Sequence, residues 1–138
     1  MKATTNTTPR GIRNNNPLNI RRSTDKWQGL SDTQTDPAFC QFKEMKWGVR
    51  AGAKLLQNYQ TKYQRNTLRQ IIERFAPPLE NNTSSYIRHV SVRAKIRPDV
   101  PIDTRDRELL FRLIEAMWYV ENGQAGDPIA ISRGLDLL

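Results

Sequence analysis

The chain has 138 residues, with 22 lysines and arginines, 14 aspartates and glutamates, one cysteine and one histidine. This length suits one domain with a buried hydrophobic core. A single cysteine excludes an internal disulfide. One cysteine and one histidine are too few ligands for a zinc site, and we predict no metal and no other cofactor. No apolar run approaches the roughly 20 residues that a membrane helix needs. The first residues lack the apolar core of a Sec signal peptide.

The net charge of +8 is unevenly distributed along the chain. Residues 1–98 carry 18 basic and 6 acidic side chains, whereas residues 99–138 carry 4 and 8. A basic surface attracts anionic polymers, whether nucleic acid, a membrane surface or the bacterial cell wall. Charge alone does not choose among these partners.

The N-terminal third is predicted to be irregular. Residues 1–9 are polar and aperiodic, and we expect a disordered arm followed by one α-rich domain over residues 10–138. From residue 10 to residue 36 the abundance of Asn, Arg, Ser, Thr and Gly predicts turns and no helix. Residues 38–42 are β-prone and predict a strand, with which residues 27–30 could pair to form a small β-hairpin.

The rest of the chain is predicted to be helical. Apolar side chains recur there at three- to four-residue spacing, which is typical of amphipathic helices. Capping side chains, prolines and glycines mark where the helices begin and end. The predicted helices are residues 47–63, one from Asn66-Thr67 to Pro77-Pro78, one beginning at Asn82-Thr83, a long one from Asp103-Thr104 to Asn122-Gly123, and a short one from Asp127-Pro128 to Gly134.

The segment Arg10–Arg22 is the most unusual in the chain, because it holds four asparagines and four arginines within thirteen residues. Arginine suits carboxylates and phosphates, and asparagine amides suit sugar hydroxyls, N-acetyl groups or base edges. The alternative is a turn-rich loop whose asparagines bond their own backbone. Trp27 could stack on a sugar or a base, unless it is a core residue under the hairpin.

Three acids are candidates for chemistry, since glycoside cleavage needs a protonated carboxyl and, often, a second carboxylate. Glu80 follows a rigid Pro-Pro-Leu turn that could raise its pKa, although it could equally stabilise the N-terminus of the next helix. Asp36 lies in the predicted hairpin region. Glu121 lies at a helix C-terminus, where the helix dipole disfavours a negative charge unless it has a partner. Glu121 is therefore a minor candidate for a structural hydrogen-bond anchor.

The order of several motifs resembles a family of phage and prophage proteins commonly labelled virion or structural proteins. The resemblance covers about residues 10–123. The chain departs from the family pattern at Phe75, usually Trp, and at Leu18, usually Gly, where we expect a restricted backbone. The matching motifs are RGIRNNNPLNIRR, Trp27-Gln28-Gly29, Asp36 with Phe39 and Phe42, Gly48-Val49-Arg50-Ala51, Leu56 with Tyr59, Thr67 with Ile71-Ile72, FAPPLENNTSSYI and the late Glu121-Asn122-Gly123.

That family in turn looks similar to lysozyme-like peptidoglycan hydrolases, especially cell-wall glucosaminidases. Those have an Asn/Gly loop, a small hairpin, and a catalytic glutamate at the end of the helix that precedes the loop. Residues 1–9 of this chain contain no acid, so the resemblance supplies no catalytic residue in that place. It implies either that another acid acts or that the domain binds glycan without cutting it.

The first hypothesis is therefore a mainly α, lysozyme-like phage or prophage protein that engages peptidoglycan. If it is an enzyme, it is a glycoside hydrolase or a lytic transglycosylase, with Glu80 as general acid and Asp36 as second carboxylate. Glu80 or Asp36 should then share a groove with the saccharide-binding residues. Those predicted residues are Arg13, Asn15, Asn16, Asn19 and Trp27.

Two other hypotheses remain open. One is a non-catalytic virion component that contacts other virion proteins through the same loop. The other is a basic nucleic-acid-binding module, which would act through non-specific phosphate contacts. The expected location is the virion or the bacterial cytoplasm, with delivery to the periplasm by a route that uses no Sec signal peptide.

Overall fold

The computed structural model describes residues 8–79 and 81–138, so most of the predicted arm and Glu80 lie outside the described residues. Within these ranges no helix is long and apolar enough to cross a membrane. The helices of the described part are α1 (Arg10–Arg13), α2 (Met45–Tyr63), α3 (Leu68–Phe75), α4 (Thr83–Ala94), α5 (Arg107–Asn122) and α6 (Pro128–Leu135). The expectation of a mainly helical protein is confirmed.

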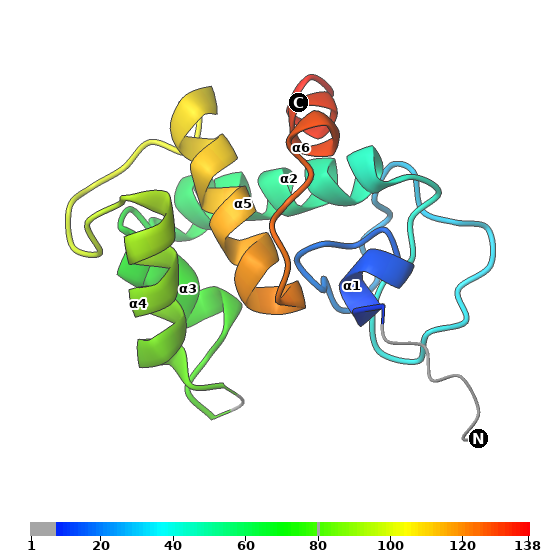
Figure 1. Cartoon of the computed structure of the whole chain (residues 1–138), viewed down its shortest axis with the longest axis horizontal. Helices are drawn as coiled ribbons and strands as arrows, with labels where there is room; N and C mark the ends of the chain where they lie inside the picture. Colours follow the sequence, from blue (N-terminus) through cyan, green and yellow to red (C-terminus); the bar gives the residue numbers. More distant parts are fainter. Residues whose placement is uncertain (1–7, 80) are drawn as a thin grey trace.

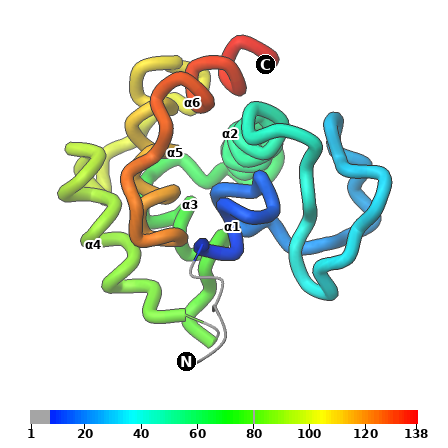
Figure 2. The backbone as a smooth tube through the Cα atoms, turned by 45° about the vertical axis from the view of Figure 1, so that its right-hand side comes forward, coloured from blue at the N-terminus to red at the C-terminus, as the bar shows by residue number. Residues whose placement is uncertain are grey.

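The long helix α2 is the element around which the others are arranged (Figure 1). It packs against α3, α5 and α6, while α4 packs against α3 and α5. The short α1 contacts α5, so a segment near the start of the described chain lies against one from its last third. Figure 2 shows that the later part of the segment between α1 and α2, in light blue and cyan, extends to the side of this helical body.

The predicted helix starts follow local capping chemistry. The Thr67 side chain accepts a hydrogen bond from the backbone N–H of Gln70, and the Gln70 side chain accepts one from the backbone N–H of Thr67. The two bonds form a capping box at the start of α3. The Asn82 side chain caps α4 by accepting from the backbone N–H of Ser85, and Asp127 precedes a proline in the first turn of α6. Gly123 ends α5 in the left-handed region at φ 68°, as its position predicts.

Three boundaries differ from the prediction. Helix α2 begins at Met45, two residues before the predicted start. Helix α5 begins at Arg107, because Asp106 caps its first turn while the Asp103 carboxylate is bound to Arg105. Helix α6 continues through Gly134 to Leu135 instead of ending at the glycine.

The prediction of no helix between residues 10 and 36 is wrong at its first residues, where α1 forms. The carbonyl of Pro9 accepts from the backbone N–H of Arg13 at 3.0 Å and closes this single turn. Pro9 lacks an N–H itself, and the first helical N–H groups have no partner within the helix, so a proline is tolerated there.

The predicted hairpin is not confirmed, since the described residues contain only two isolated bridges and no sheet. The bridges join Arg21 to Phe39 and Leu30 to Phe42. Side-chain amides take the place of ladder partners: Gln34 bonds both backbone groups of Gln41, with its Oε1 accepting at 2.8 Å and its Nε2 donating at 2.7 Å. The segment therefore satisfies its backbone without regular strands.

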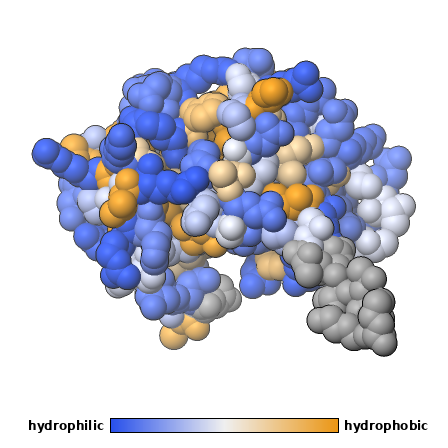
Figure 3. All heavy atoms as spheres, viewed as in Figure 1, coloured by the Kyte–Doolittle hydropathy of each residue, from blue (hydrophilic) through white to orange (hydrophobic). Residues whose placement is uncertain are grey.

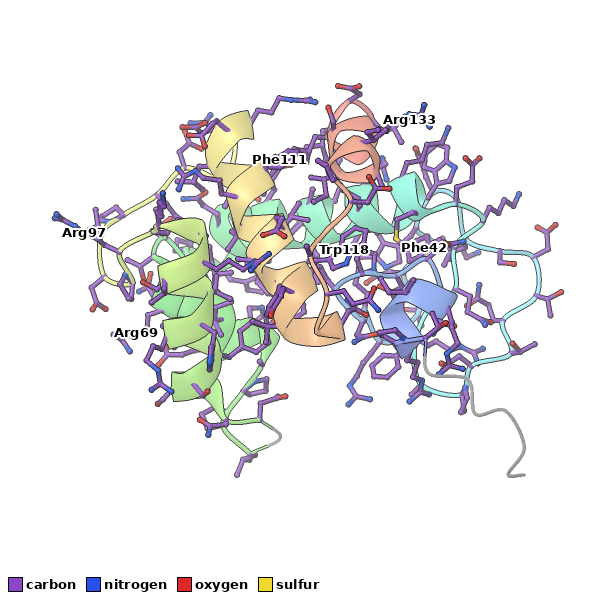
Figure 4. The ribbon with its side chains drawn as sticks, in the orientation of Figure 1. Phe42, Arg69, Arg97, Phe111, Trp118 and Arg133 are labelled. Carbon is purple, nitrogen blue, oxygen red and sulfur yellow. The ribbon has the colours of Figure 1, made fainter. Side chains whose placement is uncertain are left out.

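The Asn-rich loop contributes directly to the hydrophobic core. Leu18 is fully buried, and a Cβ at Gly52 of α2 would lie only 2.8 Å from its Cδ1. The loop has positive φ at Asn15 and Asn19, and not at Leu18, so this position does not need the glycine that the family usually has there. Phe42 and Trp118, labelled in Figure 4, are each only 3% exposed.

Candidate functional site

A groove of about 400 Å³ lies where the Asn-rich loop, α2 and α5 meet the α3–α4 junction. One wall comes from the loop, residues 18–27, and the opposite wall from Arg74 to Pro77 at the end of α3. Leu55 and Tyr59 of α2 also line it, as does Glu121 from the last turn of α5. Figure 1 shows the C-terminal end of α5 reaching the space between α1 and the α3–α4 pair.

Glu121 is the partly buried acid of this groove. Its Oε1 accepts from Asn19 Nδ2 at 2.8 Å, and its Oε2 accepts from the Tyr86 hydroxyl at 2.9 Å. Burial raises the pKa of Glu121, and the two hydrogen bonds oppose that rise. The negative end of the α5 dipole acts in the same direction as burial. A carboxyl with a raised pKa keeps its proton to higher pH, as a general acid requires.

Tyr86 of α4 is held in a fixed position beside Glu121. It is 7% exposed, and its ring meets that of Phe75 edge-on with centroids 6.1 Å apart. Burial, together with the neighbouring Glu121 charge, raises the pKa of Tyr86 well above its ordinary value of 10. The hydroxyl therefore remains a neutral donor to Glu121 at any physiological pH.

Two polar atoms on the groove-lining residues are shielded from solvent and have no hydrogen-bond partner within residues 8–79 and 81–138. They are the Asn19 carbonyl oxygen and the Trp27 indole N–H. A buried polar atom without a partner is costly and calls for an explanation. Both atoms are buried inside the fold, and the Asn19 oxygen lies toward Gly11 of α1, where a Cβ would stand 3.0 Å from it, so these atoms mark how the loop packs and not a surface open to a ligand.

The Asp36 carboxylate lies outside this groove, in a structural network. It accepts from Arg10 Nε at 2.6 Å, from Asn14 Nδ2 at 2.9 Å, and from the backbone N–H groups of Ala38 and Phe39. The Arg10 guanidinium and these N–H donors hold the pKa of Asp36 well below its usual range. Its side chain is 8% exposed and fully committed, which suits a structural anion.

Comparison with known proteins places the chain among phage proteins. It is 39% identical over 121 residues to Protein P5 of Pseudoalteromonas phage PM2, an alignment that covers 86% of this chain and 74% of that protein. The chain belongs to the P5 family. No protein-family model matches it. The expectation that the chain belongs to a family of phage proteins is thus confirmed.

Three other predicted binding residues lie outside the groove of this P5-family chain. Asn16 is fully buried and bonds the backbone of Ile20 and Cys40. Asn15 donates to the Phe42 carbonyl, and the exposed Arg13 donates to the backbone of a neighbouring residue. The bonds of Asn16 to Ile20 fit the alternative of a loop whose asparagines bond its own backbone, whereas Asn15 bonds a residue 27 positions later in the chain. Of the predicted residues, the groove brings together Asn19 and Trp27.

The sequence predicts that Glu121 needs a hydrogen-bond partner, but it does not predict that Glu121 lines a groove. The signal was an acid in the last turn of a helix, directly before Asn122-Gly123, where its charge is disfavoured. The structure supplies the partners in Asn19 and Tyr86. Among the described residues no cluster of three or more His, Cys, Asp or Glu could hold a metal ion.

Proposed function

We propose that this P5-family chain is a lysozyme-like phage protein that binds peptidoglycan glycan strands in the groove and cleaves them with Glu121 as general acid. One observation carries the proposal: a carboxyl with a raised pKa lines a groove large enough for a saccharide. In this proposal Glu121 takes the general-acid role for which Glu80 is the candidate from the sequence. A place in the virion, where the protein would meet the cell wall during entry, belongs to the same proposal.

The position of Glu121 relative to the Asn-rich loop supports a lysozyme-like site. In lysozyme-like hydrolases the acid ends a helix that leads into an Asn/Gly loop. Here Glu121 ends α5, and its carboxylate bonds Asn19 of the loop, 102 residues earlier in the sequence. The helix-end acid thus contacts the Asn-rich loop, although the helix comes after the loop in the chain.

The lining of the groove supports a saccharide as ligand. It includes the Trp27 and Tyr59 rings together with polar side chains such as Asn81. An aromatic face can pack against a sugar ring, and a side-chain amide can bond the hydroxyl and N-acetyl groups that peptidoglycan strands carry.

The chemistry follows from the two hydrogen bonds to Glu121. The carboxyl gives its proton to the glycosidic oxygen as the bond between that oxygen and the sugar breaks. Asn19 and Tyr86 then donate to the resulting carboxylate, whose charge they stabilise. The same carboxylate can take a proton back from the attacking hydroxyl, either of water or of the sugar itself. Water gives hydrolysis, and the sugar hydroxyl gives an anhydro product.

The test is digestion of purified peptidoglycan by the full chain. We expect wild type to release soluble glycan, and Glu121→Gln to lose roughly 100-fold or more of that activity, because amides cannot donate the proton. Glu73→Gln, an exposed acid on α3 outside the groove, is the matched control and should keep full activity. Mass spectrometry of the products distinguishes hydrolysis from transglycosylation. An unchanged rate in Glu121→Gln would end the proposal.

One observation favours a second function, a non-catalytic virion component. Both oxygens of Glu121 already have partners within the chain, as in a purely structural buried acid. In that case folded wild type would bind glycan or virion proteins without producing new chain ends. Glu121→Gln would then change the free energy of unfolding and nothing else.

A further inference from the structure

A second cavity, of about 450 Å³, continues the groove away from Glu121 along α2. The two cavities share Trp27, Tyr59 and Arg74 among their lining residues, so they form one continuous cleft. The second cavity extends the cleft to Lys62 and Tyr63, at the C-terminal end of α2. A ligand that reaches past Trp27 therefore enters a different chemical environment.

Arg74 dominates this part of the cleft. Its guanidinium carbon lies 3.6 Å from the centroid of the Tyr63 ring and 5.2 Å from that of Tyr59. Stacking fixes the plane of the guanidinium and leaves its N–H edge for hydrogen bonds. Within the described ranges Arg74 has no carboxylate partner. Other arginines are paired with acids: Arg10, Arg69, Arg93, Arg105, Arg107 and Arg112.

The charges around Arg74 favour an anion. Lys26 and Lys62 line the same cavity, against Asp25 as the acid in its lining. Asp25 already accepts a hydrogen bond from the Ser23 hydroxyl at 3.2 Å. Three cations face one carboxylate in a space bounded by aromatic rings. The three side chains are exposed, and the positive potential that they create favours an anionic group over an uncharged one.

We propose that Arg74, Lys62 and Tyr63 form a subsite that binds a carboxylate carried by the glycan strand, while Trp27 and Tyr59 pack against the sugar. This inference rests on the proposed function, because it assigns a feature of the same ligand. Peptidoglycan carries carboxylates of two origins: the lactyl ether of glycan without peptide, and the peptide stems attached to that ether. The chemistry that the subsite recognises is common to both.

The test measures affinity by calorimetry in a Glu121→Gln background, which keeps the saccharide intact. Three ligands of equal length separate the sources of charge: chitin oligosaccharide with no carboxylate, peptide-free glycan, and peptide-bearing glycan. Arg74→Gln removes the stacked cation, and Arg97→Gln, an exposed arginine in the loop after α4 (Figure 4), removes the same charge elsewhere. The wild-type chain with a single disaccharide serves as a check on the background variant.

We expect Arg74→Gln to weaken binding of a carboxylate-bearing glycan roughly 5-fold, as for loss of one charge-assisted hydrogen bond at an exposed site. Binding of chitin oligosaccharide should weaken less than this, since Arg74 also lines the groove and stacks on Tyr59, and Arg97→Gln should bind all ligands as its parent does. The carboxylated ligand that loses affinity identifies the source. Equal affinity of Arg74→Gln and its parent for both carboxylated glycans would overturn the subsite while the proposed function stands. Failure of every glycan to bind would overturn the proposed function itself.

Discussion

At Glu121 the kind of partner decides the protonation state. Partners that carry a positive charge would hold the carboxyl ionised, as Arg10 does for Asp36. Asn19 and Tyr86 are neutral, and their hydrogen bonds stabilise the carboxylate less than burial penalises it. The net result is a raised pKa with a fixed geometry. That combination allows a carboxyl both to donate a proton and to hold the charge left behind.

The variant Tyr86→Phe tests the balance between burial, which raises the pKa of Glu121, and hydrogen bonding, which lowers it. The hydroxyl donates to the carboxylate, so its loss should raise the pKa of Glu121 further and move the alkaline limb of the pH–activity profile to higher pH. Turnover at the optimum should fall several-fold, because the carboxylate formed in the reaction loses a donor. The measurement is the rate of peptidoglycan digestion from pH 4 to 9.

Tyr119→Phe is the matched control for that profile. Tyr119 is 42% exposed on α5, its ring lies under the Arg93 guanidinium, and it does not line the groove. Its variant should reproduce the wild-type profile. If Tyr86→Phe lowers the rate equally at every pH, Tyr86 acts on the fold and not on the protonation of Glu121.

At the scale of the elements, a glycine in α2 determines where the Asn-rich loop can lie. A Cβ at Gly48 would overlap the backbone carbonyl oxygen of Asn15, and backbone cannot turn away as a side chain can. Gly52, one turn later, faces the tip of the Leu18 side chain. The helix and the loop thus touch through backbone at Gly48, and this contact fixes the wall that carries Asn19.

Gly48→Ala should therefore destabilise the protein although alanine is the better helix former. The helix preference favours alanine by about 1 kcal/mol, but displacing the loop should lower the free energy of unfolding by roughly 3 kcal/mol net. Gly52→Ala should cost less, about 1 kcal/mol, because a leucine side chain can adjust. Urea unfolding measures both. Equal effects would show that the backbone contact at Asn15 is not the constraint.

The difference between local signals and contacts between distant residues explains which elements the sequence predicts and which it does not. Helices α3, α4 and α6 follow from local signals, since a cap such as Thr67 lies next to the turn it stabilises. Helix α1 has four residues and no periodicity to read, and it owes its place to the packing of α5. The pair Asn19–Glu121 joins residues 102 apart, and no local pattern encodes that contact.

Across the whole molecule, Glu121 differs from the acids that form ion pairs with arginines. In residues 99–138, acids form ion pairs with arginines in both halves of the chain, such as Asp99 with Arg69 and Glu115 with Arg93. Glu121 has no cation partner within the described residues and is held by neutral donors. The surface around this body is largely hydrophilic on the face shown in Figure 3. The positive excess remains available to attract an anionic polymer.

The fold as a whole should show opposite pH dependences from Asp36 and Glu121. The lowered pKa of Asp36 means that its contribution to stability is present above its ordinary pKa of 3.8 and is lost as the pH falls through its folded value. The raised pKa of Glu121 means that its contribution is present below 4.5 and is lost as the pH rises through its folded value.

Urea unfolding from pH 3 to 8 separates the two carboxyls. Asp36→Asn should have a free energy of unfolding lower than that of wild type by on the order of 2 kcal/mol at pH 7, because its charge-assisted hydrogen bonds weaken. On acidification, the free energy of unfolding of this variant should fall less than that of wild type. Glu121→Gln should lose less stability than wild type as the pH rises above 4.5. Glu73→Gln should follow the wild-type curve, since this acid is exposed on α3 and has neither a described hydrogen bond nor a described ion pair. A Glu121→Gln curve parallel to wild type would mean that burial does not raise the pKa of Glu121, and the assignment of the general acid would lose its physical basis.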